Sequence, residues 1–146
     1  MDKTYEILLE AMNRWLPEPQ YLHPELKILR AMPIGGKPCP EQMIHSDYVL
    51  GDDFDVVKDA MPYSAVTAMH GDATSVTLVM EFEKTGKYIE LVVPLLPGDM
   101  LLFGGNVFHK GRPYAMPNLR MFAYFPTIKY KPKDELTILS DVTIIK

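Results

Sequence analysis

Hydrophobic residues recur at two different spacings along the chain. Near the start they follow the helical period, so that apolar side chains gather on one face. This face consists of Ile7, Leu8, Ala11, Met12, Trp15 and Leu16. Pro17 and Pro19 follow directly, and proline does not continue a helix. The pattern predicts one amphipathic helix over residues 4–16.

The rest of the chain alternates apolar and polar residues with a period of two, which is typical of half-buried β-strands. Turn sequences such as Lys84-Thr85-Gly86 and Pro97-Gly98-Asp99 separate the runs. His70-Gly71-Asp72 is interpreted as another turn, at the tip of an exposed hairpin. The predicted strands are 26–34, 42–45, 63–69, 75–82, 88–93, 100–103, 107–110 and 120–125. The acidic segment 51–59 is expected to be a solvated loop or a short turn of helix.

About eight short strands separated by turns predict a sandwich or barrel, and a double-sheet jelly roll fits this number. The length of 146 residues fits a single domain. We expect the helix over about 4–16, the β core over about 26–127 and a C-terminal extension over about 128–146.

Composition narrows the class of protein. With 47% hydrophobic and 23% charged residues the chain is typical of a soluble globular protein. A net charge of −4 without a basic cluster gives no support to nucleic-acid binding. The single cysteine, Cys39, excludes an internal disulfide. No apolar run reaches the ~20 residues of a membrane span and no signal-peptide core is present, so we expect a cytoplasmic protein without a membrane partner.

The candidate chemistry lies in the histidines. Two of the 4 stand in His-x-Asp pairs, His45-Ser46-Asp47 and His70-Gly71-Asp72. Residues i and i+2 of an extended strand point the same way, so both side chains of a pair can reach one ion. Two histidines and one carboxylate on one side of a metal leave positions open for other ligands, which suits non-haem iron(II) oxygenases.

The order of motifs further along the chain resembles a known family. Pro97-Gly98-Asp99 precedes an apolar strand, His109-Lys110-Gly111 follows it, and Arg120 opens the last strand. Together with His45 and Asp47, this order is similar to the iron(II)- and 2-oxoglutarate-dependent dioxygenase superfamily. It is most similar to the phytanoyl-CoA-hydroxylase-like branch. The prolyl-4-hydroxylase branch is a second resemblance, although that branch commonly has lysine near the position of Arg120. The similarity extends over about residues 26–125.

The resemblance implies a mainly β fold, the double-stranded β-helix or jelly-roll barrel. It implies that iron(II) binds His45, Asp47 and His109, and that Arg120 holds the distal carboxylate of 2-oxoglutarate. The activity implied is an oxidoreductase that hydroxylates an unidentified substrate with O₂ and releases succinate and CO₂. Related halogenases lack the carboxylate ligand, so Asp47 favours hydroxylation or a demethylation of the same type. The chain between His70 and His109 is too short for the intervening strands, so His45 and Asp47 are the favoured pair.

Arg120 also has a physical case of its own. A buried arginine requires an anion, and a planar guanidinium matches a carboxylate. An internal salt bridge to Asp or Glu is the alternative. Weaker candidates are Tyr63, Thr67 and Thr77, which are expected on inner strands and could hydrogen-bond the cosubstrate, and Gln42, which could also line the pocket. For each of them packing or a surface position is the alternative.

Three other classes of protein stay open. A cupin-like metalloprotein would share the barrel, but the sequence has no His-x-His. A non-catalytic jelly-roll binding domain would make the three ligands accidental. A zinc hydrolase could use two histidines and one aspartate, but it would not explain Arg120. The substrate, the oligomeric state and the question whether the chain is a whole enzyme are not determined by the sequence.

Overall fold

The computed structural model describes residues 10, 14, 22, 24–31, 38–71, 74–132, 137–138 and 143–144. The helix predicted over residues 4–16 lies outside this part, apart from Glu10 and Arg14. These two side chains form an ion pair of 2.9 Å at a spacing of four residues. No helix among the described residues is long and apolar enough to cross a membrane.

The described chain is mainly β. Its strands are β1 (Glu25–Ala31), β2 (His45–Ser46), β3 (Tyr63–Gly71), β4 (Thr74–Phe82), β5 (Lys87–Leu95), β6 (Met100–Gly104), β7 (Phe108–Gly111), β8 (Asn118–Phe125), β9 (Thr137–Ile138) and β10 (Thr143–Ile144). The first eight confirm the eight strands expected from the sequence. The last two are short additions in the C-terminal extension. The segment 51–59 is a loop, as expected.

Several predicted strand ends differ from the observed ones by one to three residues, and two of the differences concern residues of the His-x-Asp pairs. The second strand begins at His45, where the prediction ended it. His70 and Gly71 belong to β3 and do not form a turn, because they pair with Leu119 and Asn118 of β8. A β-bulge between Ala68 and His70 shifts the register there and lets the pairing continue.

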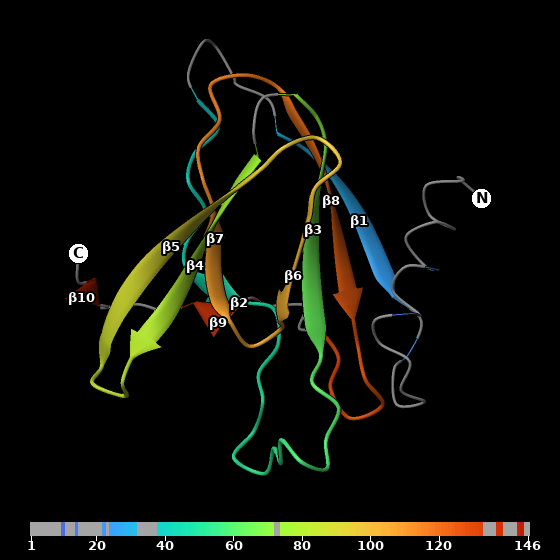
Figure 1. Ribbon diagram of the computed structural model, residues 1–146, viewed down its shortest axis with the longest axis vertical. Helices are drawn as coiled ribbons and strands as arrows, with labels where there is room; N and C mark the ends of the chain where they lie inside the picture. The colour runs from blue at the N-terminus through green and yellow to red at the C-terminus, as the bar shows by residue number, and fades with distance from the viewer. Residues whose placement is uncertain are drawn as a thin grey trace.

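The strands form two sheets, which lie opposite each other in Figure 1. One sheet has the order β1-β8-β3-β6 and the other the order β10-β5-β4-β7-β2-β9. Within them the first strand pairs with the eighth, the second with the seventh, the third with the sixth and the fourth with the fifth. This is the pairing of one long hairpin whose tip is the β4–β5 turn. Successive pairs lie in alternate sheets, so the hairpin is folded back on itself.

The hydrophobic core lies between the two sheets. Its buried members come from β3, β6 and β8 of the four-stranded sheet and from β4 and β5 of the other. They are Val66, Ala68, Val76, Leu95, Phe103 and Phe122. Because one cluster joins side chains of both sheets, the sheets pack face to face, and the residues that alternate with the core members point outward.

A second apolar cluster covers the outer face of the four-stranded sheet. Ala65, Ala123 and Phe125 are buried there, with Tyr63 and others packed against them. Successive side chains of β3 therefore go to opposite clusters, with Ser64 and Val66 inward and Tyr63 and Ala65 outward. Both faces of β3 are covered.

The loop between β2 and β3 hangs below the sheets in the view of Figure 1. Lys129, in the segment after β8, connects this loop to the end of β8 by ion pairs. Its Nζ lies 3.0 Å from the carboxylate of Asp59 and 3.1 Å from that of Asp53. The ring of Phe54 meets Tyr130 edge-on, with centroids 5.6 Å apart.

Candidate metal centre

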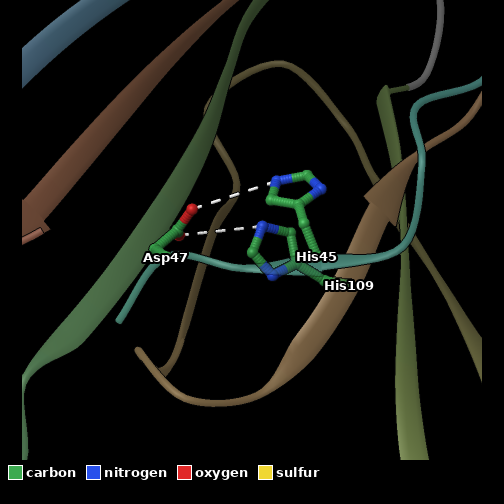
Figure 2. Close-up of side chains that lie close together, drawn as sticks. All are labelled: His45, Asp47 and His109. Atoms are coloured by element: carbon green, nitrogen blue, oxygen red, sulfur yellow. Dashed lines mark ion pairs between the residues drawn. The ribbon is translucent and has the colours of Figure 1, made fainter. Parts of the chain in front are cut away.

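His45 and His109 are direct cross-strand partners in the antiparallel pair of β2 and β7. Opposite residues of such a pair project from the same face. Their rings are accordingly close, with centroids 4.4 Å apart. Asp47 follows β2 and stands two residues after His45, so it returns to the same side. Figure 2 shows the two imidazoles and the carboxylate pointing toward one another.

The three side chains offer one ligand atom each within a small volume. His45 Nε2 lies 3.9 Å from Asp47 Oδ1, and His109 Nε2 lies 3.7 Å from Asp47 Oδ2. All three ligand atoms lie within 4.8 Å of one another. The residues are only 5%, 4% and 1% exposed. The sequence expectation that these residues come together is met by this geometry.

The hydrogen bonds of the two histidines leave the same nitrogen available on each ring. His45 Nδ1 lies 2.7 Å from the carbonyl oxygen of Met43, and His109 Nδ1 lies 3.0 Å from that of Val107. A carbonyl only accepts, so each Nδ1 carries the proton and each neutral ring has its lone pair on Nε2. Backbone carbonyls commonly orient metal-binding histidines in this way.

A metal ion would satisfy an atom that is otherwise left without a partner. His109 Nε2 is buried and has no hydrogen-bond partner among the described residues. An unsatisfied buried polar atom is costly. Two imidazole nitrogens and a carboxylate are ligands that iron and zinc both accept. The donor set therefore fits a transition metal, and open coordination positions fit a catalytic one.

Electrostatics favour the metal-binding protonation state. Burial is the largest influence on His109 and lowers its pKa below the ordinary value of 6.5, although the Asp47 carboxylate acts in the opposite direction. The ring is therefore kept neutral, as a ligand must be.

Two tyrosines that feel the charge of Asp47 are also affected. Burial, and after it the Asp47 carboxylate, raises the pKa of Tyr124 to about 12, and the same two causes raise the pKa of Tyr48.

The carboxylate of Asp47 is held by a serine from the facing sheet. Ser64 Oγ of β3 donates a hydrogen bond of 2.5 Å to Asp47 Oδ2. Both residues are buried. Sequence reasoning missed Ser64, whose only signal is a polar residue within an apolar strand.

Arg120 lies on the inner face of β8 and is 5% exposed. Its Nη1 donates a 2.8 Å hydrogen bond to the hydroxyl of Tyr114, and its Nε has no partner among the described residues. The guanidinium stacks near the rings of Tyr114 and Phe122, 5.2 and 5.3 Å from their centroids. In the part of the chain that the structure describes, no carboxylate pairs with it. The internal salt bridge that we kept as an alternative is not found there.

The structure does not bring Tyr63 and Thr67 to this site. Tyr63 packs in the outer cluster of the four-stranded sheet, and Thr67 lies four residues further on the same face of β3. This corrects the expectation that both line the interior. Thr77 alternates with the core residue Val76 and also faces outward.

Gln42 is the weaker candidate that does reach the inner site. Its Oε1 accepts a 2.9 Å hydrogen bond from the backbone NH of Gly111. His70 is exposed near the end of β3, which belongs to the other sheet than β2 and β7. Asp72 lies outside the described residues. The second His-x-Asp pair therefore gains no support as a metal site.

Solved structures of other proteins share this fold. A prolyl 4-hydroxylase of Phytophthora capsici is 17% identical with a TM-score of 0.52, and the similarity covers 84% of this chain and 40% of that one. A prolyl 4-hydroxylase of Pseudomonas putida is 20% identical with a TM-score of 0.53, covering 89% of this chain and 64% of that one. No family profile and no curated protein matches the sequence.

At these identities the likeness shows a common jelly-roll-like fold and no more. The chain spans 40% and 64% of the lengths of the two hydroxylases. The activity of the two hydroxylases is therefore no evidence for the activity of this chain. Evidence has to come from its own residues, above all from the cluster of His45, His109 and Asp47.

Proposed function

We propose that this protein is a non-haem iron(II)- and 2-oxoglutarate-dependent dioxygenase that hydroxylates a substrate with O₂. The observation that carries the proposal is the buried cluster of His45, Asp47 and His109, in which His109 Nε2 lacks a partner among the described residues. The cluster is the two-histidine, one-carboxylate ligand set of this class of oxygenase. The fold likeness to two prolyl 4-hydroxylases supports it.

We also propose that the fold is the double-stranded β-helix of this superfamily. The pairing of first with eighth, second with seventh, third with sixth and fourth with fifth strand supports it. The position of His45 directly opposite His109 in the β2–β7 pair also supports it. The motif order with Arg120 favours the phytanoyl-CoA-hydroxylase-like branch, whereas the two solved structures are prolyl 4-hydroxylases. The proposal therefore stays with the superfamily.

Each residue of the site has a role in this proposal. His45, Asp47 and His109 hold the iron, and Ser64 fixes the carboxylate of Asp47. Arg120 binds the distal carboxylate of 2-oxoglutarate. This carboxylate would supply the anion for the buried guanidinium, which has no carboxylate partner among the described residues. The three ligand side chains are buried, so that they have little contact with bulk water.

When bound, iron(II) supplies the O₂ chemistry that no side chain can perform. The overall reaction consumes 2-oxoglutarate, O₂ and a substrate C–H bond, and yields succinate, CO₂ and the hydroxylated product. One oxygen atom goes to succinate and the other to the product. The side chains contribute position and charge: three metal ligands and one cation.

The proposal is tested by an anaerobic absorbance titration of metal-free protein with iron(II) and then 2-oxoglutarate. We expect a weak visible charge-transfer band in wild type. His109→Ala should abolish it, and Arg120→Ala should require far more 2-oxoglutarate. His70→Ala is the matched control, because this histidine is exposed and outside the cluster, and it should leave the band unchanged.

Two results would contradict the proposal in different ways. If wild type binds iron but shows no charge-transfer band at high 2-oxoglutarate concentration, a cupin-like metalloprotein becomes the better-supported hypothesis. Failure of wild type to bind iron, with zinc bound tightly, would favour a zinc site instead.

A further inference from the structure

The surroundings of Arg120 form a small polar group of their own, on the interior side of Gly111. Tyr114 is buried there at 6% exposure, although it belongs to neither sheet. Its hydroxyl donates to the carbonyl of Ser75 over 3.1 Å and accepts from Arg120 Nη1 over 2.8 Å. A hydroxyl has one proton to donate and can accept at the same time. Tyr114 therefore ties the Arg120 guanidinium of one sheet to the backbone of β4 in the other.

Gln42 approaches the same place from the segment before β2. Its backbone NH donates to the Gly111 carbonyl over 3.0 Å, and its Oε1 accepts from the Gly111 NH over 2.9 Å. These two bonds fix the side-chain amide and use its oxygen. The amide NH₂ is the part of Gln42 that can still donate to a ligand.

Gly111 provides the space between these groups. A Cβ on Gly111 would lie 2.6 Å from Gln42 Oε1 and 3.0 Å from Arg120 Nη1. No side chain fits there without displacing one of them. The same distances show that the Gln42 side-chain amide and the Arg120 guanidinium both lie next to Gly111, with the Gln42 oxygen as an acceptor and Arg120 Nη1 as a donor.

The space beside Gly111 lies two residues further along β7 than the proposed metal ligand His109. Gly111 follows His109 by two residues in β7, so both face the interior and lie about 7 Å apart along the strand. That separation is of the order of the length of a five-carbon dicarboxylate. A diacid held at one end by the metal would bring its other carboxylate to Gly111.

We propose that Gln42, Gly111 and Tyr114 complete a carboxylate pocket around Arg120. Tyr114 is a positioning residue that orients the guanidinium, Gln42 donates the second hydrogen bond, and Gly111 keeps the volume open. The inference rests on the proposed function, because 2-oxoglutarate is the diacid that the pocket would receive. It adds three residues that the motif resemblance does not assign.

The test measures anaerobic binding of 2-oxoglutarate to the iron-loaded protein by calorimetry, with iron affinity and melting temperature as separate readouts. Tyr114→Phe removes only the hydroxyl and should weaken 2-oxoglutarate binding about tenfold, since one charge-assisted hydrogen bond is lost. Iron affinity should be unchanged. A merely structural role would instead lower melting temperature and iron affinity together.

Gln42→Glu is the sharper variant. It keeps an oxygen for the Gly111 NH and can pair with Arg120, so the fold should be retained. However, it replaces a donor by a negative charge beside the ligand carboxylate, and we expect at least a hundredfold loss of 2-oxoglutarate affinity. Glu41→Gln is the matched control: the neighbouring side chain pairs with Lys110 and should leave 2-oxoglutarate binding unchanged.

The possible outcomes separate the two proposals. If wild type binds no 2-oxoglutarate, both the function and the pocket are wrong. If wild type binds and Arg120→Ala weakens binding, but Gln42→Glu and Tyr114→Phe bind as wild type does, only the pocket is wrong. If Tyr114→Phe does not fold, Gln42→Glu decides alone.

Discussion

His45 and His109 occupy directly opposite positions of β2 and β7, and their ring centroids lie 4.4 Å apart. Backbone pairing therefore sets the separation of the two imidazole rings, because opposite residues of an antiparallel pair have nearly fixed Cβ positions. β2 has only two residues, but it is paired on both sides, with β7 and with β9. The relative placement of the two histidines thus depends on strand pairing inside the sheet, whereas Asp47 lies just after β2.

Ser64→Ala is predicted to weaken iron(II) binding about 10- to 100-fold, since residues that orient a ligand have effects of this size. The hydroxyl that donates to Asp47 Oδ2 would be lost, and the carboxylate could rotate. Calorimetric iron titration measures the effect. Thr67→Ala, on the outer face of the same strand, is the control. Equal iron affinities in all three proteins would show that Ser64 does not orient Asp47.

Stability of the metal-free protein should depend on pH through His109. Burial lowers the pKa of His109 in the folded state below 6.5, its ordinary value. Below pH 6.5 the unfolded chain therefore takes up a proton that the folded one resists, so this contribution is present above 6.5 and is lost as the pH falls toward the folded pKa. Urea unfolding between pH 8 and pH 5 measures it.

The pH dependence has its own control. His109→Gln should remove this part of the slope, whereas His70→Gln, at an exposed position, should keep it. Identical slopes for wild type and His109→Gln would show that His109 is not responsible.

Gly105→Ala is predicted to destabilise the fold by about 1–3 kcal/mol, as overpacking of a core does. A Cβ there would collide with the ring of Tyr48, which is 1% exposed and directly follows Asp47. Gly104→Ala is the neighbouring control. The nearest atom to its Cβ is the side-chain oxygen of Asn106 at 3.2 Å, which can move aside. Thermal unfolding of both variants tests the prediction, and an equal loss in each would contradict it.

Lys129→Met should loosen the 51–59 loop without unfolding the sheets. Lys129 joins Asp53 and Asp59, whereas Lys58 pairs with Asp55 within the loop. Hydrogen exchange of the loop amides should become faster in Lys129→Met, and added salt should act in the same direction in wild type. Lys58→Met should have a smaller effect. Unchanged exchange in Lys129→Met would mean that the aromatic contact of Phe54 with Tyr130 suffices to hold the loop.

The sequence alone predicted the strands and the candidate ligand residues. Period-two alternation and turn residues identified all eight principal strands, with errors at their ends, because both depend on neighbouring residues only. The His45-x-Asp47 spacing likewise puts two candidate ligands on one side of an extended segment. The helix over residues 4–16 stays a prediction, because it lies outside the described residues except at Glu10 and Arg14.

The faces of the strands were decided only by the tertiary structure. Ala65 and Val66 of β3 are both 0% exposed, because the four-stranded sheet is covered on both sides. Alternation then distinguishes two faces but does not say which one is the interior. For this reason Tyr63 and Thr67 were assigned to the site, and Ser64, which does reach it, was not.

Contacts between residues far apart in the chain could not be predicted from the sequence either. His109 finds His45, and Tyr114 bridges Arg120 to Ser75, only because the long hairpin of strands folds back and brings the two sheets together. Local patterns fix local geometry, whereas these contacts depend on which strands pair and how the sheets pack. The candidate ligands could therefore be proposed from the sequence, but their clustering and the groups that orient them are properties of the packed sheets.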